Sequence, residues 1–125
     1  MEYEEITHEI IGSAYRVYNQ LGFGFLESVY KKAMLIELAK RNLKVEEEKP
    51  LEVYYDNQAV GLFYVDLFVE DEILVELKST QNLAKEHEVQ LVNYLTGLHK
   101  EIGLLINFGP TGVEVKRKFR QPRIP

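Results

Sequence analysis

Three charged residues lie inside sequence that otherwise has the apolar and aromatic character of β-strands. Asp66 precedes the tripeptide Glu76-Leu77-Lys78 by ten residues, and apolar residues surround both positions. A carboxylate or an ammonium group in such surroundings costs desolvation energy unless it is paired or binds a metal ion. The placement of these charges therefore indicates a chemical site.

The expected strand register brings the two acids together. Side chains alternate between the two faces of a strand, so Glu76 and Lys78 share one face. The turn signal at Glu70-Asp71-Glu72 predicts a hairpin centred on Asp71, and this register places Asp66 directly opposite Glu76. Their Cβ atoms would lie about 4.5 to 5.5 Å apart, where like charges repel. Such a pair either raises the pKa of one acid or binds a divalent cation.

The chemistry that suits this arrangement is metal-assisted phosphoryl transfer. Mg²⁺ accepts one or two carboxylates and keeps water and substrate phosphate oxygens in its octahedron. Lys78 can hold or help deprotonate a water molecule aimed at phosphorus, and it can offset the negative charge of the transition state. The alternative is that Glu76 and Lys78 form the solvated face of an edge strand. Against it, Leu74 shares that face and a helix is expected to cover it.

Hydrophobic periodicity predicts the elements that must position these residues. Apolar residues recur at helical spacing over residues 6–21, 26–41 and 83–98. Strand-like runs occupy residues 45–55, 59–70, 73–79, 102–108 and 113–119. Pro50 is expected to break the first of these runs, and Asp56-Asn57 to turn the chain after it. The order ααβββαββ predicts an α/β (α+β) fold, a mixed β-sheet flanked by helices.

Length and composition limit the class of protein. The 125 residues, 46% of them hydrophobic, suit a single domain over residues 1–125. Because there is no cysteine, disulfides, thiolate metal sites and cysteine nucleophiles are excluded. The N-terminus is acidic and no stretch of about 18 apolar residues occurs, so we expect a cytoplasmic protein without a membrane segment.

The distribution of charge argues against a protein that coats nucleic acid with its whole surface. The formal net charge is -5, whereas phosphate binding needs clustered lysine and arginine. Basic residues do gather near the C-terminus, at Lys116, Arg117, Lys118, Arg120 and Arg123. We interpret this cluster as a solvated strand edge or tail, with contact to a phosphate backbone as the alternative.

Two motifs in the right order resemble a known family. Asp66 followed by Glu76-Leu77-Lys78 resembles the core of PD-(D/E)XK nucleases, and the segment Gly24-Phe25-Leu26-Glu27-Ser28-Val29-Tyr30 is similar to the GxxExxY pattern of a family within that superfamily. The resemblance covers residues 5–119. It implies a restriction-endonuclease-like fold and hydrolysis of phosphodiester bonds with Mg²⁺ or Mn²⁺. The implied partner is nucleic acid, with DNA favoured over RNA. Val65 stands where the superfamily label has a proline, a residue without a chemical role.

The same resemblance implies further metal ligands. Glu27 matches a helical acid that many such nucleases aim at the metal ion, and the backbone carbonyl of Leu77 would be a ligand together with Asp66 and Glu76. The alternative for Glu27 is a favourable charge in the first turn of a helix.

It also implies supporting residues. Gln90 and Tyr94 resemble the QxxxY element of another branch of the superfamily and would lie one helical turn apart. Tyr30 completes the GxxExxY pattern. The alternative for Gln90 and Tyr94 is hydrogen bonding to a neighbouring strand.

Two hypotheses therefore stand at the level of sequence. The first is a divalent-metal-dependent nuclease that uses Asp66, Glu76, Lys78 and Glu27. The second is a non-catalytic accessory module that retains the nuclease fold and binds nucleic acid or protein. A domain this small offers little surface to a substrate, so a homodimer or a protein partner is expected for either.

Overall fold

The structure, a computed structural model, describes residues 2–121. The elements, in chain order, are α1 (Tyr3–Leu21), α2 (Glu27–Lys40), β1 (Val45–Tyr55), β2 (Gln58–Val69), β3 (Ile73–Lys78), α3 (Lys85–Leu98), β4 (Ile102–Phe108) and β5 (Val113–Phe119). This is the predicted order ααβββαββ, with element ends within a few residues of those expected.

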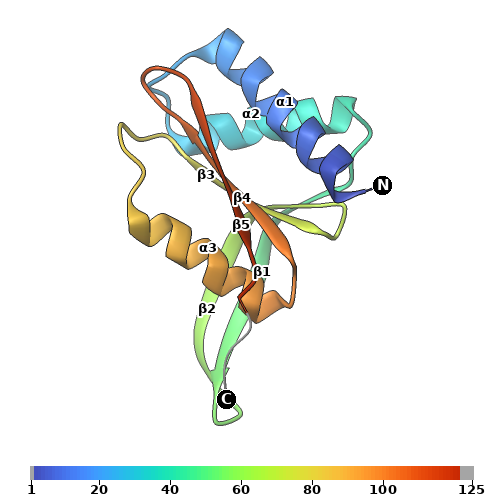
Figure 1. Ribbon diagram of the computed structural model, residues 1–125, viewed down its shortest axis with the longest axis vertical. Coiled ribbons are helices and arrows are strands. Elements are labelled where there is room, and N and C mark those ends of the chain that lie inside the picture. Colours follow the sequence, from blue (N-terminus) through green and yellow to red (C-terminus); the bar gives the residue numbers. More distant parts are fainter. Residues whose placement is uncertain (1, 122–125) are drawn as a thin grey trace.

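The strands form one mixed sheet in the order β1-β2-β3-β4-β5. Neighbouring strands are antiparallel except β3 and β4, which are parallel and are connected through α3. Helices α1 and α2 lie on one side of the sheet and α3 lies on the other (Figure 1). The predicted restriction-endonuclease-like α/β fold is confirmed.

Each face of the sheet has its own core. Residues 73, 75 and 77 of β3 point toward α1 and α2, where they pack with Ile10, Tyr30 and Met34. Leu74 points the other way and packs with Leu91 and Leu95 of α3. The alternation places Glu76 and Lys78 on the α3 side of β3, and a helix does cover that face.

A long hairpin projects from the sheet. Strands β1 and β2 pair from Val45 with Val69 to Tyr55 with Gln58, whereas β2 pairs with β3 over residues 67–69. The distal part, residues 49–64, extends beyond the other strands (Figure 1) and is called the β1–β2 arm below. The turn at Asp56-Asn57 occurs as predicted, since both residues have positive φ, 54° and 61°, as a type I′ turn requires.

The expected break at Pro50 is wrong. Pro50 pairs with Tyr64 inside a continuous β1, and the register shift in this strand lies between Val53 and Tyr54. The physical reason is that β1 is an edge strand. Every second N–H of an edge strand points away from its partner, so proline can occupy such a position without removing a ladder hydrogen bond.

The approach of α3 to the sheet gives a first prediction. A Cβ at Gly103 in β4 would lie 2.9 Å from Cδ1 of Leu91 and 3.2 Å from the carbonyl oxygen of Leu74. We expect Gly103→Ala to lower the free energy of unfolding in urea by about 1 to 3 kcal/mol, because the helix must move outward. Gly12→Ala is the control. Its Cβ would meet the flexible end of Arg41, at 2.9 Å from Nη1, so equal losses in both variants would contradict this packing argument.

Candidate active site

Asp66 and Glu76 meet where β2 separates from β3. Residues 67–69 pair with residues 73–75 in the predicted register, and Asp66 and Glu76 occupy the next position. Side chains make the contact there: the N–H of Asp66 donates to Oε1 of Glu76 over 3.3 Å, and the N–H of Leu77 donates to Oδ2 of Asp66 over 2.8 Å. The two carboxylates are therefore each held by the backbone of the opposite strand.

The regular alternation of side chains between the two faces of the sheet is interrupted in β2 at Asp66. Val65 packs with the α3-side core, whereas Leu67 packs with the core beneath α1 and α2. In a regular strand, residues two apart point to the same face. Glu48 lies between the two β1 residues that pair with Leu67 and Val65, and its φ is 54°. This irregularity directs the Asp66 side chain toward the backbone of β3.

The electrostatics of the pair show that its charges are not balanced. Burial and the negative charge of Asp66 raise the pKa of Glu76 from its ordinary 4.5 to about 8, against the opposing effects of the Asp66 N–H and the Lys78 ammonium. Burial also raises the pKa of Tyr94, with further contributions from Glu76 and Asp66. The raised pKa favours the protonated form of Glu76 near neutral pH.

A small cavity connects Asp66 to α2. The cavity has a volume of about 130 Å³ and is lined by Glu27, Ser28, Lys31, Asp66 and Leu77. Glu27, the first residue of α2, therefore lies on the same cavity as Asp66. Among residues 2–121, however, no three acidic, histidine or cysteine side chains lie close enough together to hold a metal ion. The structure brings Asp66 and Glu76 together and places Glu27 at the edge of their site.

Lys31 is a candidate site residue that the sequence reasoning missed. Its ammonium forms ion pairs with Glu48 and, at 3.5 Å, with Glu47. The hydrogen bond to Glu48 is the largest cause of its raised pKa, and Asp66 also raises it. The available signal was its position four residues after Glu27, which is one turn along the same helix face.

Tyr30 does not line the cavity at Asp66 but contacts the loop that precedes α2. Its hydroxyl donates to the carbonyl oxygen of Gly22 and accepts the N–H of Phe25 over 3.4 Å. Its ring is buried and stacks on Phe108, with centroids 4.3 Å apart. Tyr30 thereby fixes the loop between α1 and α2, and this loop sets where Glu27 begins its helix.

A buried asparagine fixes the chain directly after Lys78. Asn107 pairs with Lys78 across β3 and β4. Its Nδ2 donates to the carbonyl oxygen of Thr80, and the N–H of Thr80 donates to its Oδ1, both over 2.9 Å. Nδ2 also donates to Glu114 over 3.0 Å. Sequence reasoning missed Asn107, although a polar residue inside the apolar run Ile102–Phe108 was the signal.

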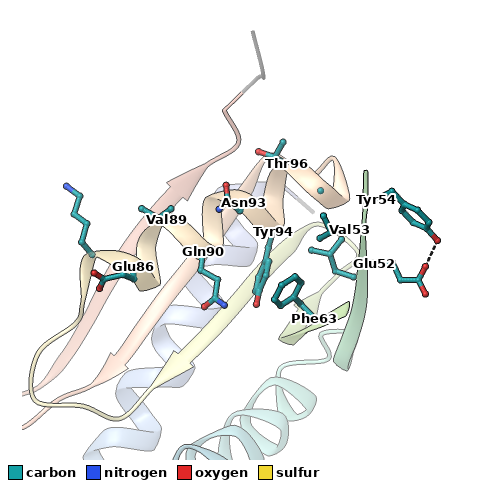
Figure 2. Close-up of a pocket in the computed structure, with 13 residues that line it drawn as sticks. Glu52, Val53, Tyr54, Phe63, Glu86, Val89, Gln90, Asn93, Tyr94 and Thr96 are labelled. Atoms are coloured by element: carbon teal, nitrogen blue, oxygen red, sulfur yellow. Dashed lines mark hydrogen bonds between the residues drawn. The ribbon is translucent and has the colours of Figure 1, made fainter. Parts of the chain in front are cut away.

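Gln90 and Tyr94 lie on α3 and line a groove of about 890 Å³ between this helix and the β1–β2 arm (Figure 2). Tyr94 is buried and packs with Val65, the neighbour of Asp66, whereas Gln90 is exposed. His87, on the same helix, accepts the N–H of Ala84 at its Nδ1 over 3.2 Å and so caps the start of α3.

The basic cluster lies on β5, the other edge of the sheet. Lys118 pairs with Glu88 at 2.6 Å and Arg120 pairs with Glu101 at 2.8 Å. Arg123 lies outside the described residues. These pairs agree with the interpretation of a solvated strand edge for Lys118 and Arg120.

Fold and site together define an α/β protein in which two acidic residues, Asp66 and Glu76, lie where the pairing of β2 with β3 ends. The sequence profile described as the PD-(D/E)XK nuclease superfamily matches residues 4–118. The chain therefore belongs to this superfamily, which typically uses a divalent metal ion. None of the helices within residues 2–121 is long and apolar enough to cross a membrane.

Among solved structures, the crystal structure of SSO0001 is similar. The TM-score is 0.61 with 17% sequence identity, and the match covers 78% of this chain and 52% of that chain. This chain thus spans about half the length of that protein, and the likeness concerns the fold. A search of curated protein sequences finds no match.

The raised pKa of Glu76 predicts how stability depends on pH. The folded protein holds this proton up to pH of about 8, whereas the unfolded chain releases it near the ordinary 4.5. Because the folded state binds more protons in this window, the free energy of unfolding of the metal-free protein falls as pH rises from 4.5 to about 8.

We expect Glu76→Gln to remove this slope and to be more stable than the parent at the alkaline end, by on the order of 1 to 3 kcal/mol. Urea unfolding in a chelating buffer across this range measures it. Glu52→Gln, on the exposed arm, is the control. A parent protein whose stability rises through the same window would contradict the prediction.

Proposed function

We propose that this chain is a divalent-metal-dependent nuclease that hydrolyses phosphodiester bonds of nucleic acid, with DNA favoured over RNA. The observation that carries the proposal is the pair Asp66 and Glu76. Each carboxylate accepts a hydrogen bond from the backbone of the opposite strand, and the pKa of Glu76 is raised to about 8. A divalent cation would offset the negative charge of this pair. The pair lies in a chain of the PD-(D/E)XK nuclease superfamily.

The residues present fit Mg²⁺ or Mn²⁺. Asp66 and Glu76 are hard oxygen donors, and Glu27 and the carbonyl of Leu77 are the further ligands that we propose. A bound divalent ion supplies Lewis-acid polarisation of a phosphate oxygen and lowers the pKa of water. The hydrogen bond from the Leu77 N–H to Asp66 keeps one acid oriented in its absence.

The lysines of the site have separate proposed roles. Lys78, on the α3 side of β3 with Glu76, holds the attacking water and stabilises negative charge at phosphorus. Lys31, on the cavity that Asp66 also lines, binds a phosphate oxygen of the substrate when it leaves Glu48. Asn107 keeps Lys78 in place by fixing the following residues.

We also infer that the chain belongs with the GxxExxY proteins. Gly24 has φ of 116°, a conformation that L side chains rarely adopt. Tyr30 anchors the same loop, and Glu27 lies between them in sequence. The motif thus combines two residues that shape a loop with one acid that the loop presents.

The second candidate, a non-catalytic module that retains the nuclease fold, is favoured by one observation. Within residues 2–121 no third acid joins Asp66 and Glu76 closely enough to form a metal site. Such a module would bind nucleic acid or a protein partner without cleaving.

Cleavage assays separate the two candidates. Plasmid, single-stranded DNA and RNA are incubated with the protein and Mg²⁺ or Mn²⁺. We expect Asp66→Asn and Lys78→Met to lower the cleavage rate by about 100-fold or more. Asp56→Asn, at the tip of the arm, and Lys116→Met, on β5, are matched controls that should cleave like the parent. Unchanged rates in Asp66→Asn would refute the assignment of the site.

Calorimetry tests the metal site without requiring activity. We expect Mg²⁺ or Mn²⁺ binding by the parent protein and loss of the binding heat in Asp66→Asn, since one of two carboxylate ligands is removed. The amide still accepts the Leu77 N–H, so the fold is preserved. Equal binding by Asp56→Asn and loss in Asp66→Asn supports the site, whereas no binding by the parent favours the accessory module.

We expect removal of the Lys31 charge to affect metal binding and nucleic-acid binding in opposite directions. Removing its charge in Lys31→Met should tighten divalent-ion binding by a few fold, because a cation beside the carboxylates repels another cation. The same change should weaken binding of a single-stranded oligonucleotide, because a phosphate contact is lost. Lys32→Met, exposed on the neighbouring position of α2, is the control. Weaker binding of both ligands would contradict this role.

A further inference from the structure

A groove separates α3 from the β1–β2 arm. Its volume is about 890 Å³. One end is narrow, because at Gly97 the helix approaches β1 so closely that a Cβ would lie 3.2 Å from Cδ1 of Leu51. From there the groove runs along α3 past Tyr94 and Gln90 toward Glu86 near the start of the helix. The size is within the range of about 300 to 1,000 Å³ that holds single small ligands.

The floor of the groove contains an available aromatic ring. Phe63 is 41% exposed, and its ring lies against the buried Tyr94 with centroids 5.7 Å apart and an interplanar angle of 44°. Figure 2 shows Phe63, Tyr94 and Gln90 directed into the space between helix and arm, whereas Tyr54 and Glu52 point away from it. Tyr94 therefore supports Phe63 from behind, and one face of Phe63 is open to a ligand.

The groove lies near the candidate active site, because Tyr94, which lines it, belongs to a buried cluster that reaches β2 and β3 next to the two acids. Tyr94 packs with Val65, which precedes Asp66, and with Leu74, which shares its face of β3 with Glu76. Phe63 lies on the same strand as Asp66. Phe63 lines the groove and precedes Asp66 by three residues on β2, so a nucleic-acid chain bound there would need to extend along β2 to reach the carboxylates.

We propose that this groove binds an unpaired segment of the nucleic-acid substrate, with a base stacked on Phe63. The inference rests on the proposed nuclease function and specifies its substrate as single-stranded or locally unpaired at the site. Stacking on an aromatic ring accepts any base, because every base has a π-face. The amide of Gln90 lies on the helix side of the groove, where it can hydrogen bond to a base edge or to the backbone.

Size and lining favour this occupant over others. Pockets of this volume hold small ligands, and single bases enter such pockets. An apolar helix or a second copy of the chain would need a continuous apolar face. Here the exposed apolar side chains Val53, Phe63 and Val89 are interspersed with polar residues of α3, which are Lys85, Glu86, Gln90 and Asn93.

The test measures binding of a fluorescein-labelled oligothymidylate in a chelating buffer, so that no cleavage occurs. We expect Phe63→Ala to weaken binding by roughly 5- to 100-fold, the effect of removing one base–aromatic stack. Phe63→Tyr keeps the ring and should bind like the parent. Tyr55→Ala is the matched control, because Tyr55 is an exposed aromatic at the tip of the arm, 75% exposed. Urea unfolding of each variant verifies that the fold is intact.

A second readout reports stacking itself. An oligonucleotide that contains a fluorescent adenine analogue should lose fluorescence on binding to the parent and to Phe63→Tyr, and keep it with Phe63→Ala. A blunt duplex of the same sequence should bind more weakly than the single strand. Oligouridylate in place of oligothymidylate should also depend on Phe63, because the ring contacts the base and not the sugar.

The outcomes distinguish this inference from the proposed function. If cleavage requires Asp66 but Phe63→Ala binds the oligonucleotide as tightly as the parent protein, the proposed role of the groove is wrong and the proposed nuclease function stands. If oligonucleotide binding depends on Phe63 but the protein cleaves none of the substrates, the proposed role of the groove is supported and the proposed nuclease function is wrong. Self-association that is lost in Phe63→Ala, with no oligonucleotide binding by the parent, overturns the inference in favour of a second copy of the chain.

Discussion

The hydrogen bond from the N–H of Leu77 to the carboxylate of Asp66 is the contact on which the site depends. Strand β2 leaves β3 at this point to form the arm, and the ladder between the two strands stops. A buried N–H without a partner would cost about 1 to 3 kcal/mol, and Asp66 accepts it over 2.8 Å. The backbone of Asp66 donates to Glu76 in return. The same two acids therefore join the strands and form the site.

This dual use explains the charge distribution around the site. Joining two strands through carboxylates brings like charges together in a partly buried place, and the cost appears as the raised pKa of Glu76. The protein supplies cations nearby: Lys78 on β3 lowers that pKa, and Lys31 lies on the cavity beside Asp66. Yet Lys31 is itself paired with Glu47 and Glu48, so its charge is shared. The two carboxylates thus lie side by side with only partial compensation of their charge, which is the arrangement on which the proposed divalent-ion site rests.

The sequence predicted those features that follow from local pattern. Apolar periodicity predicted the eight elements, and the turn at Asp71 predicted the register that pairs residues 67–69 with 73–75. What escaped prediction depends on tertiary position. Pro50 is harmless because β1 is an edge strand, which no local signal reports. For Lys31 and Asn107 the sequence offered a local signal, but their contacts with Glu48 and Thr80 depend on how distant elements pack. The role of Tyr30 as a loop anchor likewise follows from its hydrogen bonds to Gly22 and Phe25 in the folded chain.

The change of facing at Asp66 also connects the site to the groove. If β2 alternated regularly through this residue, Val65 and Phe63 would point to the same face as Leu67, toward α1 and α2. Instead Val65 packs beneath α3 and Phe63 contacts Tyr94 there. One local irregularity thus directs an acid toward β3 and turns an aromatic ring toward α3. Because a slip of one residue in β2 would reverse both, the position of the carboxylates and the lining of the groove are set by the same backbone feature.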